Sequence, residues 1–319
     1  MISIPKKDLW LSCGFFLFFL AALISPWDYS CTKWLGTHAI PWFTRFMDSS
    51  FFEGKSFGGG DLGTLYMITC ALFYFGAWLP LPSNRLMRYR PELGFVLTSS
   101  LVTTVFVVHG LKWTIGRARP SLVLWNGELP FTSWFKLGPY NLLDGFFNGS
   151  FPSGHTATIM IFLTLAYIIA FHGTWNRYRL GSSIGMLTLG LAFLMAIARS
   201  MNRSHFITDG MVVIALNWLI IHFLYFKILR VPEQQEIIVH QGQANGMPTC
   251  WELRLCLHGF FLVAGLMAVA IGARSWSSST TIIPSIALLL TGTGLTIFFA
   301  RKTWRFYSHI AKALVTPKK

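Results

Sequence analysis

Three short segments of the chain combine basic side chains with serine, histidine and aspartate, residue types that bind anions and transfer protons. KWTIGRARP spans residues 112–120, PSGH spans 152–155, and ARSMNRSHFITD spans 198–209. The candidate site residues in them are Lys112, Arg119, Ser153, Gly154, His155, Arg199, His205 and Asp209. Each segment borders a long apolar stretch, so the elements around them decide whether these residues meet.

The cations and the second segment match the oxygens of a phosphate group. Lys112, Arg119 and Arg199 would supply positive charge, and arginine adds forked N–H donors suited to a tetrahedral anion. Ser153 and Gly154 begin an apolar segment, and the N-terminus of a helix there would offer N–H groups to the same anion. These residues predict phosphate binding.

The two histidines and the aspartate add proton transfer. His205 and Asp209 are four residues apart, so on a helix they share a face, and the carboxylate could fix one imidazole tautomer. His155 would point at the same place from the first turn of its helix. Together with the cations, they predict a phosphoryl-transfer site that uses no metal and no other cofactor.

Each segment has a simpler interpretation when it stands alone. Cations that follow a membrane span can reach lipid headgroups, Pro-Ser-Gly can cap a helix, and a histidine four residues before an aspartate can form a helix-end hydrogen bond. The three segments are expected on one membrane face, and that coincidence favours a site.

The composition indicates an integral membrane protein of the all-α class. Of 319 residues, 53% are hydrophobic and 12% are charged, and the mean hydropathy is +0.53. A soluble domain carries roughly 25% charged residues, so this chain cannot cover a water-facing surface. Stretches of about 20 apolar residues cross a bilayer as helices. A polytopic bundle of about eight such helices is expected, at residues 9–25, 62–80, 94–111, 156–171, 181–198, 210–227, 256–273 and 282–300. The alternative for the first stretch is a cleaved signal peptide.

The distribution of cations predicts the orientation of these helices. With eight helices both termini share one side, which carries 16 Lys and Arg residues against 10 on the other side. Positive charge marks the cytoplasmic side, so the termini are expected inside and the three segments outside. Topology then explains most of the net charge of +14, and no nucleic-acid partner is expected. The loop lengths suit a bacterial inner membrane with a periplasmic site.

A polar segment divides the chain near residue 230. Residues 1–230 are expected to form a six-helix core, and residues 231–319 a polar cytoplasmic linker, a two-helix hairpin and a basic tail. In the tail, Trp304, Tyr307, Ala311 and Leu314 could share one face of a surface helix on the inner leaflet. An ordinary basic tail is the alternative.

The two long outer connections, residues 26–61 and 112–154, are rich in aromatic side chains. Aromatic rings favour the headgroup level of a bilayer. A belt at the membrane surface and a wall for lipid entry are both open interpretations.

The combined spacing of the three segments resembles the type 2 phosphatidic acid phosphatase superfamily. The pattern is Lys112, six residues and Arg-Pro; then Pro-Ser-Gly-His at 152–155; then Arg199, five residues, His205, three residues and Asp209. The resemblance covers roughly residues 60–228. It implies a six-helix core that acts on lipid phosphates at the membrane surface.

The resemblance also implies a role for each candidate residue. His205 would be the nucleophile that forms a phosphohistidine, and Asp209 would orient it. His155 would be the general acid for the leaving group and later the base that activates water. The remaining residues would stabilise the transferring phosphoryl group: Lys112, Arg119, Ser153, Gly154 and Arg199.

One position departs from the family pattern, because Ala198 stands where a serine normally precedes the arginine. A hydroxyl there would contribute one hydrogen bond, about 0.5–1.5 kcal/mol, so the change is expected to tune the site rather than inactivate it.

Three functions remain compatible with these residues: a lipid phosphatase, a phosphotransferase that passes the group to another lipid, and a non-enzymatic lipid-binding protein. The expected partners are the bilayer and a lipid phosphate. Phosphatidic acid, phosphatidylglycerol phosphate, undecaprenyl pyrophosphate and lipid A are the candidate substrates.

Overall fold

The structure of the protein is a computed structural model. It describes residues 6–49, 52, 62–79, 85–140, 144, 147–172, 174–241, 248–277 and 282–315. All regular elements in this part of the chain are helical, which confirms the all-α prediction.

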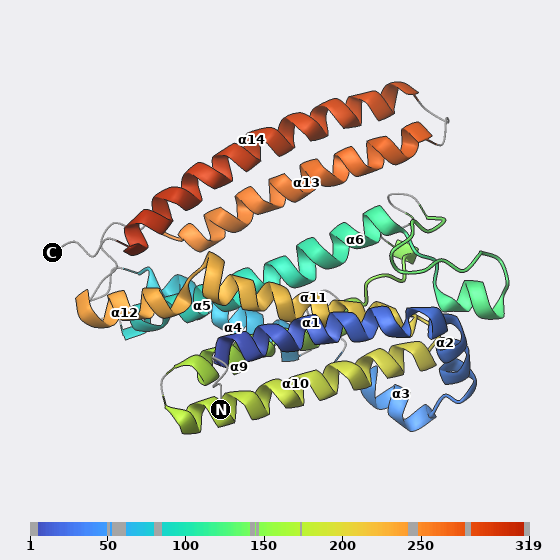
Figure 1. The fold of residues 1–319 in the computed structure, drawn as a ribbon, viewed down its shortest axis with the longest axis horizontal. Helices are drawn as coiled ribbons and strands as arrows, with labels where there is room; N and C mark the ends of the chain where they lie inside the picture. Colours follow the sequence, from blue (N-terminus) through green and yellow to red (C-terminus); the bar gives the residue numbers. More distant parts are fainter. Residues whose placement is uncertain are drawn as a thin grey trace.

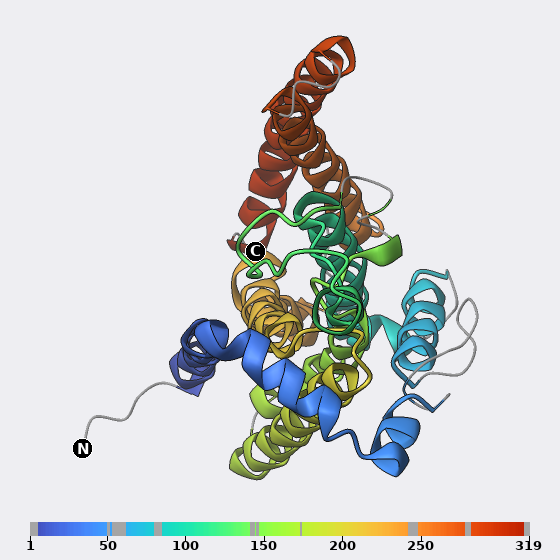
Figure 2. The same cartoon turned by 90° about the vertical axis from the view of Figure 1, so that its right-hand side faces the viewer.

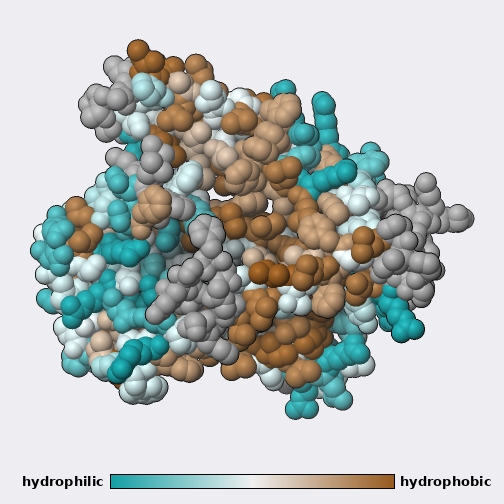
Figure 3. All heavy atoms as spheres, turned by 180° about the vertical axis from the view of Figure 1, so that it is seen from behind, coloured by the Kyte–Doolittle hydropathy of each residue, from teal (hydrophilic) through white to brown (hydrophobic). Residues whose placement is uncertain are grey.

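The bundle is built from helices long enough to cross a membrane. Within the part of the chain that the structure describes, seven helical stretches qualify by length and composition: Lys6–Thr37, Arg85–Ile115, Gly154–Phe171, Trp175–Met201, Ile207–Ile228, Trp251–Trp276 and Ile283–Lys312. An eighth apolar helix, α4 (Leu62–Ala77), has 16 residues and is shorter than the expected 62–80. Figure 3 shows a hydrophobic band between more hydrophilic ends of the molecule. The multi-pass bundle expected from composition is confirmed.

The elements follow one another along the chain as α1 (Lys6–Ile24), α2 (Asp28–Thr37), α3 (Pro41–Met47), α4, α5 (Arg90–Ser100), α6 (Val108–Ile115), α8 (Gly154–Met160), α9 (Leu163–Phe171), α10 (Trp175–Met201), α11 (Ile207–Phe223), α12 (Val231–Gln241), α13 (Trp251–Ser277) and α14 (Ile282–Val315). Short turns of 3-10 or π-helix join several of them. Figure 1 shows the long helices side by side, with α2, α3 and the connection between α6 and α8 at one end. That end of the bundle is the site end.

The first outer connection differs from expectation. Residues 26–61 were expected as a loop on the membrane, but α1 continues through a 3-10 turn at Ser25–Trp27 into α2. The helix α3 then begins at a proline, whose fixed backbone angle suits the first position of a helix. Residues 50–51 and 53–61 lie outside the described part.

The basic tail also differs from expectation. The helix α14 runs without a break from Ile282 to Val315, because this stretch has no proline after its first turn. Trp304 is 73% exposed, whereas Leu314 is buried. The tail therefore continues the last apolar helix. The prediction of a separate surface helix over Trp304–Leu314 is wrong.

Two glycines allow the close packing and the sharp turn that the site needs. Gly210 lies in the first turn of α11 directly against Ala196 of α10, where a side chain would clash. Gly116 ends α6 in the left-handed region, with φ of 59°, a conformation that glycine adopts without strain. The start of α11 is thereby held close to α10, and the chain after α6 turns across the site end.

The C-terminal helices α13 and α14 pack against each other, and α13 also contacts α5 and α6. Figure 2 shows this hairpin projecting from one side of the bundle. At its base Tyr74 donates a hydrogen bond of 2.8 Å to the buried carboxylate of Glu252. The division at residue 230 falls between the π-helical segment that ends at Ile228 and α12, and it stays a prediction.

Candidate active site

The three segments predicted from sequence meet at the site end. Arg117, from the first segment, donates a hydrogen bond of 2.6 Å to the Asp209 carboxylate in the third. The backbone N–H of Ser153, in the second, donates to the backbone carbonyl of Asp209 at 3.3 Å. Asp209 therefore connects all three segments, and the packing of α8, α10 and α11 brings them together.

His205 is buried, and one of its ring nitrogens is held by the backbone. Its Nδ1 lies 2.5 Å from the backbone carbonyl oxygen of Ser150. A carbonyl oxygen only accepts, so Nδ1 must carry the hydrogen. The lone pair of the neutral ring is then on Nε2. This is the tautomer that an attacking histidine requires.

Burial lowers the pKa of His205 to about 4, and the nearby charges of Arg199 and Lys112 act in the same direction. The neighbouring Asp209 carboxylate acts in the opposite direction but does not compensate. The imidazole is therefore neutral around pH 7, where its Nε2 lone pair can react.

Asp209 is fully buried and accepts three hydrogen bonds. Its donors are Arg117 at 2.6 Å, the Ser150 hydroxyl at 2.7 Å and the backbone N–H of Phe206 at 2.8 Å. Its closest approach to His205 Nδ1 is 3.7 Å. Asp209 therefore acts on His205 in two ways. Its negative charge lies nearby, and Ser150 is hydrogen-bonded to both residues.

Two of the candidate cations are close enough to influence each other. Burial and the neighbouring Arg199 guanidinium lower the pKa of Arg119 from its usual value. Arg119 also donates to the backbone carbonyl of Phe147 at 3.2 Å. Lys112, in the last turn of α6, contributes to the same positive field. Such a field favours a bound anion.

Arg199 has an acidic partner that the sequence did not indicate. Its Nη1 donates to the Asp48 carboxylate at 3.0 Å, and Asn202 donates to the other oxygen of Asp48. The backbone carbonyl of Arg199 accepts from the N–H of His205 at 3.3 Å. The turn after α10 thus places the arginine side chain and the histidine together.

The second segment starts α8 in the expected way, with one difference. Ser153 is the N-cap residue and has extended backbone angles, but its side chain forms no cap hydrogen bond. Its hydroxyl instead accepts from Thr156 at 3.0 Å, which leaves its own hydrogen to be donated. Gly154 and His155 follow in the first turn of α8.

Three buried residues that were not among the candidate site residues belong to the hydrogen-bond network around Asp209 and His205. Arg117 and Ser150 have no exposed surface, and Asp28 is 1% exposed. Arg117 lies inside the first segment and Ser150 lies three residues before Ser153, so proximity to the motifs could have indicated them. Asp28 is distant in sequence, and no sequence signal points to it.

Residues 93–231 match the model of the PAP2 superfamily. All eight candidate residues lie in this PAP2 segment, which confirms the superfamily expected from the three motifs over that range. The match supports a phosphatase that acts on phosphate esters. No match was found among curated proteins or solved structures.

The PAP2 segment extends from the first turn of α5 to the first residue of α12. It leaves out α1, α2, α3 and α4, although α2 and α3 lie at the site end. Among the described residues, no three or more His, Cys, Asp or Glu side chains are grouped so that they could hold a metal ion.

Proposed function

We propose that this protein is a multi-pass membrane lipid phosphatase that acts through a phosphohistidine on His205. The observation that carries the proposal is the hydrogen bond from His205 Nδ1 to the Ser150 carbonyl, which leaves Nε2 as the nucleophilic nitrogen. Lys112, Arg119 and Arg199 supply the charge that a phosphoryl group needs around this atom.

In the first step, the Nε2 lone pair attacks phosphorus and the bond from phosphorus to the lipid oxygen breaks. His155 gives its proton to that oxygen. The lipid then leaves as an alcohol if the substrate is a monophosphate, or as a monophosphate if the substrate is a pyrophosphate. In the second step, His155 takes a proton from water while the water oxygen attacks phosphorus. The bond from phosphorus to nitrogen breaks, phosphate leaves, and neutral His205 returns.

Electrostatic stabilisation accounts for the phosphate-binding residues. The cations and the Ser153 hydroxyl would neutralise the three peripheral oxygens of the transferring group, with the Gly154 amide as a further donor. No metal or other cofactor enters this mechanism, because three cations already supply the charge. They would also repel a divalent ion.

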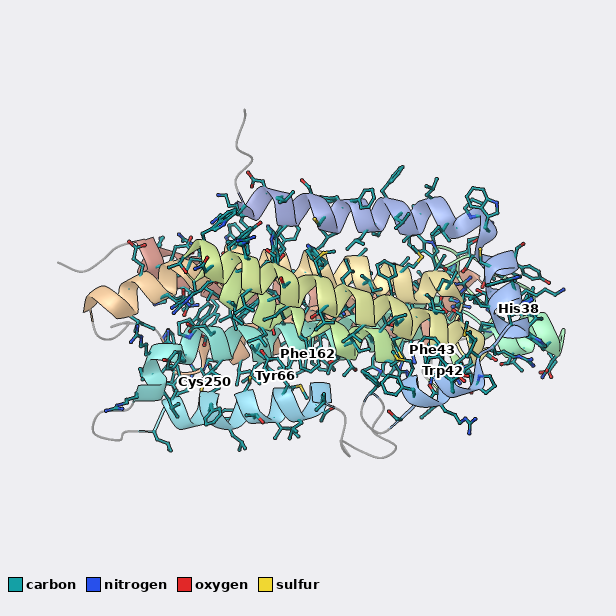
Figure 4. The ribbon with its side chains drawn as sticks, turned by 90° about the horizontal axis from the view of Figure 1, so that it is seen from below. His38, Trp42, Phe43, Tyr66, Phe162 and Cys250 are labelled. Carbon is teal, nitrogen blue, oxygen red and sulfur yellow. The ribbon has the colours of Figure 1, made fainter. Side chains whose placement is uncertain are left out.

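An apolar groove beside the second segment supports a lipid substrate. It has a volume of about 260 Å³ and runs between α4, α8 and α10. Its lining includes Thr158, one helical turn after Gly154, together with Phe162 and Leu191. Figure 4 shows Phe162 beside Tyr66 of α4, and their rings stack at 5.4 Å. An acyl chain in this groove would leave its phosphate at the start of α8.

The substrate class is tested with purified full-length protein in detergent micelles. Phosphatidic acid, phosphatidylglycerol phosphate, undecaprenyl pyrophosphate and lipid A are supplied separately, with excess EDTA, and free phosphate is measured. The proposal expects phosphate release from at least one lipid, and inhibition by vanadate. No release from any of them would contradict it, and loss of activity in EDTA that zinc or magnesium restores would contradict the metal-free mechanism.

The same assay separates the nearest alternative, transfer of the phosphoryl group to another lipid. A transferase would move labelled phosphate into a second lipid without releasing free phosphate. We favour hydrolysis, with water as the acceptor. The third function, lipid binding without catalysis, would require that no phosphoenzyme forms.

A further inference from the structure

A buried acidic residue outside the PAP2 segment is bonded to the same arginine as Asp209. Asp28, the first residue of α2, accepts from Arg117 Nη2 at 2.6 Å, and Asp209 accepts from Arg117 Nη1 at 2.6 Å. None of the three side chains is more than 1% exposed. One guanidinium is therefore shared by two buried carboxylates.

Asp28 also binds the start of the helix that carries Asp209. Its Oδ1 accepts from the backbone N–H of Thr208 at 3.1 Å, and its Oδ2 accepts from the Thr208 hydroxyl at 2.6 Å. The first N–H groups of a helix have no acceptor inside the helix. Phe206, the N-cap residue of α11, has no side-chain oxygen to offer. The carboxylate of Asp28 takes that function from another helix.

A second residue of α2 shares only the capping function. The hydroxyl oxygen of Thr32 accepts from the backbone N–H of Ile207 at 3.1 Å, and Thr32 has no hydrogen bond to Arg117. Figure 2 shows α2 across the site end of the bundle. Thr32 therefore offers a matched control on the same helix.

We infer that Asp28 is a positioning residue for the phosphoryl-transfer reaction. It fixes Arg117 and the first turn of α11, so that Asp209 keeps its bond to Ser150 and Ser150 keeps Nδ1 of His205 in place. The inference rests on the proposed function of His205. It extends the active site to a helix that the PAP2 match does not include.

The contacts of Asp28 predict which substitution is informative. Its partners include the Arg117 guanidinium and the Thr208 backbone N–H, and both can only donate. Asparagine has the same shape, but its NH₂ group must face one of these donors. Asp28→Asn therefore disturbs the network without leaving a cavity, and Asp28→Ala removes the network partner altogether.

The effect is expected on the chemical step and not on binding. Asp28 makes no hydrogen bond to Lys112, Arg119 or Arg199, the proposed phosphate ligands. Loss of a hydrogen bond between charged groups should slow phosphoenzyme formation about 10- to 100-fold. The KM should stay within about twofold, since the residues proposed to bind the phosphate keep their own contacts.

The experiment compares full-length wild type, Asp28→Asn, Asp28→Ala and Thr32→Val in detergent. The readouts are kcat, KM and the phosphoenzyme burst for the best lipid substrate and for an aryl phosphate, per folded protein. We expect a reduced burst rate and kcat in both Asp28 variants, and a clearly smaller loss in Thr32→Val, which removes one capping bond and leaves Arg117 in place. If Asp28→Ala does not fold, Asp28→Asn decides.

The contrary outcomes are distinct. Asp28→Asn with a wild-type burst would overturn the inference, as would an equal loss in Asp28→Asn and Thr32→Val, because capping alone would then explain the effect. A wild-type protein that forms no phosphoenzyme on any substrate would instead overturn the proposed function of His205, and the inference with it.

Discussion

The Nδ1 atom of His205 lies 2.5 Å from the backbone carbonyl oxygen of Ser150, closer than any atom of the Asp209 carboxylate. Ser150 uses all three of its polar groups in the site. Its carbonyl accepts from His205, its hydroxyl donates to Asp209, and its N–H donates to the carbonyl of Arg117 at 2.8 Å. Orientation of the histidine therefore depends on this one residue as well as on the carboxylate.

Ser150→Ala should slow phosphoenzyme formation about tenfold, the rate equivalent of about 1.4 kcal/mol. The substitution removes the hydroxyl bond to Asp209 and keeps the backbone carbonyl that holds His205. Ser133→Ala is the control, since Ser133 lies in the same connection outside this network. The measurement is the single-turnover burst. A rate equal to wild type would show that the bond between Ser150 and Asp209 has no part in catalysis.

The charge state of His205 gives a prediction for pH. Its pKa is lowered to about 4, below the value of about 6.5 for a free histidine. Between these values an unfolded chain binds a proton that the folded chain does not. The contribution of His205 to stability is thus complete above pH 6.5 and decreases as the pH falls towards 4.

Histidine NMR of the free protein, with His205→Gln to assign the signal, should show His205 neutral down to about pH 5. The same variant should lose less stability than wild type as the pH is lowered from 6.5 to 4. A His205 signal that titrates between pH 6 and 7 would contradict the burial of this ring in the site.

The contact between Arg199 and Asp48 predicts competition with the substrate. A phosphate that binds Arg199 must share or replace the Asp48 carboxylate, which is 32% exposed. Asp48→Asn should therefore raise the affinity for vanadate by a few-fold, about the effect of a partly exposed ion pair. Asp144→Asn controls for the loss of an exposed negative charge. Weaker vanadate binding in Asp48→Asn would mean that Asp48 instead holds Arg199 in its binding position.

The sequence predicted which three segments lie together, because each of them borders an apolar helix at the same end of the bundle. Asp209 lies in the first turn of α11, but His205 lies two residues before the first helical residue, Ile207. The expectation that the two side chains share a face of one helix is therefore wrong, and the turn after α10 places His205 instead. Gly154 and His155, by contrast, begin α8.

The hydrogen bonds between segments could not be predicted in the same way. The partner of His205 Nδ1 is the backbone carbonyl of Ser150. Every residue type has such a carbonyl, so the sequence gives no sign of this bond, and the motif suggested Asp209 as the partner instead. Asp28 lies far from Arg117 in the chain, and its role follows only from the continuation of α1 into α2. Hydropathy placed the helices well, but it could not show that α14 continues through its basic segment.

The orientation in the membrane is predicted from the excess of cations on one side. A cysteine at Asn148, which is exposed at the site end, should react with an impermeant thiol reagent in intact cells or spheroplasts whose outer membrane alone has been permeabilised. Arg88→Cys, exposed in the inner connection before α5, should react only after lysis. Both variants are made in a background without native cysteines. Labelling in the opposite order would place the site on the cytoplasmic side.

Replacement of His205 and replacement of His155 should affect the reaction rate in different ways. A nucleophile is needed whatever group leaves, so His205→Ala should abolish the turnover of every substrate. A general acid matters most when the leaving oxygen is basic. His155→Ala should therefore slow the first step about 10²- to 10⁴-fold on an alkyl lipid phosphate, and distinctly less on a nitrophenyl phosphate.

Single-turnover bursts separate these effects, because His155 would also activate water in the second step. Without that base the phosphoenzyme should accumulate on the aryl substrate, so steady-state rates would understate the first step. Asp209→Asn should lie between the two histidine variants, since it weakens the network around His205 without removing the nucleophile. A burst that survives His205→Ala and disappears in His155→Ala would reverse the two assignments.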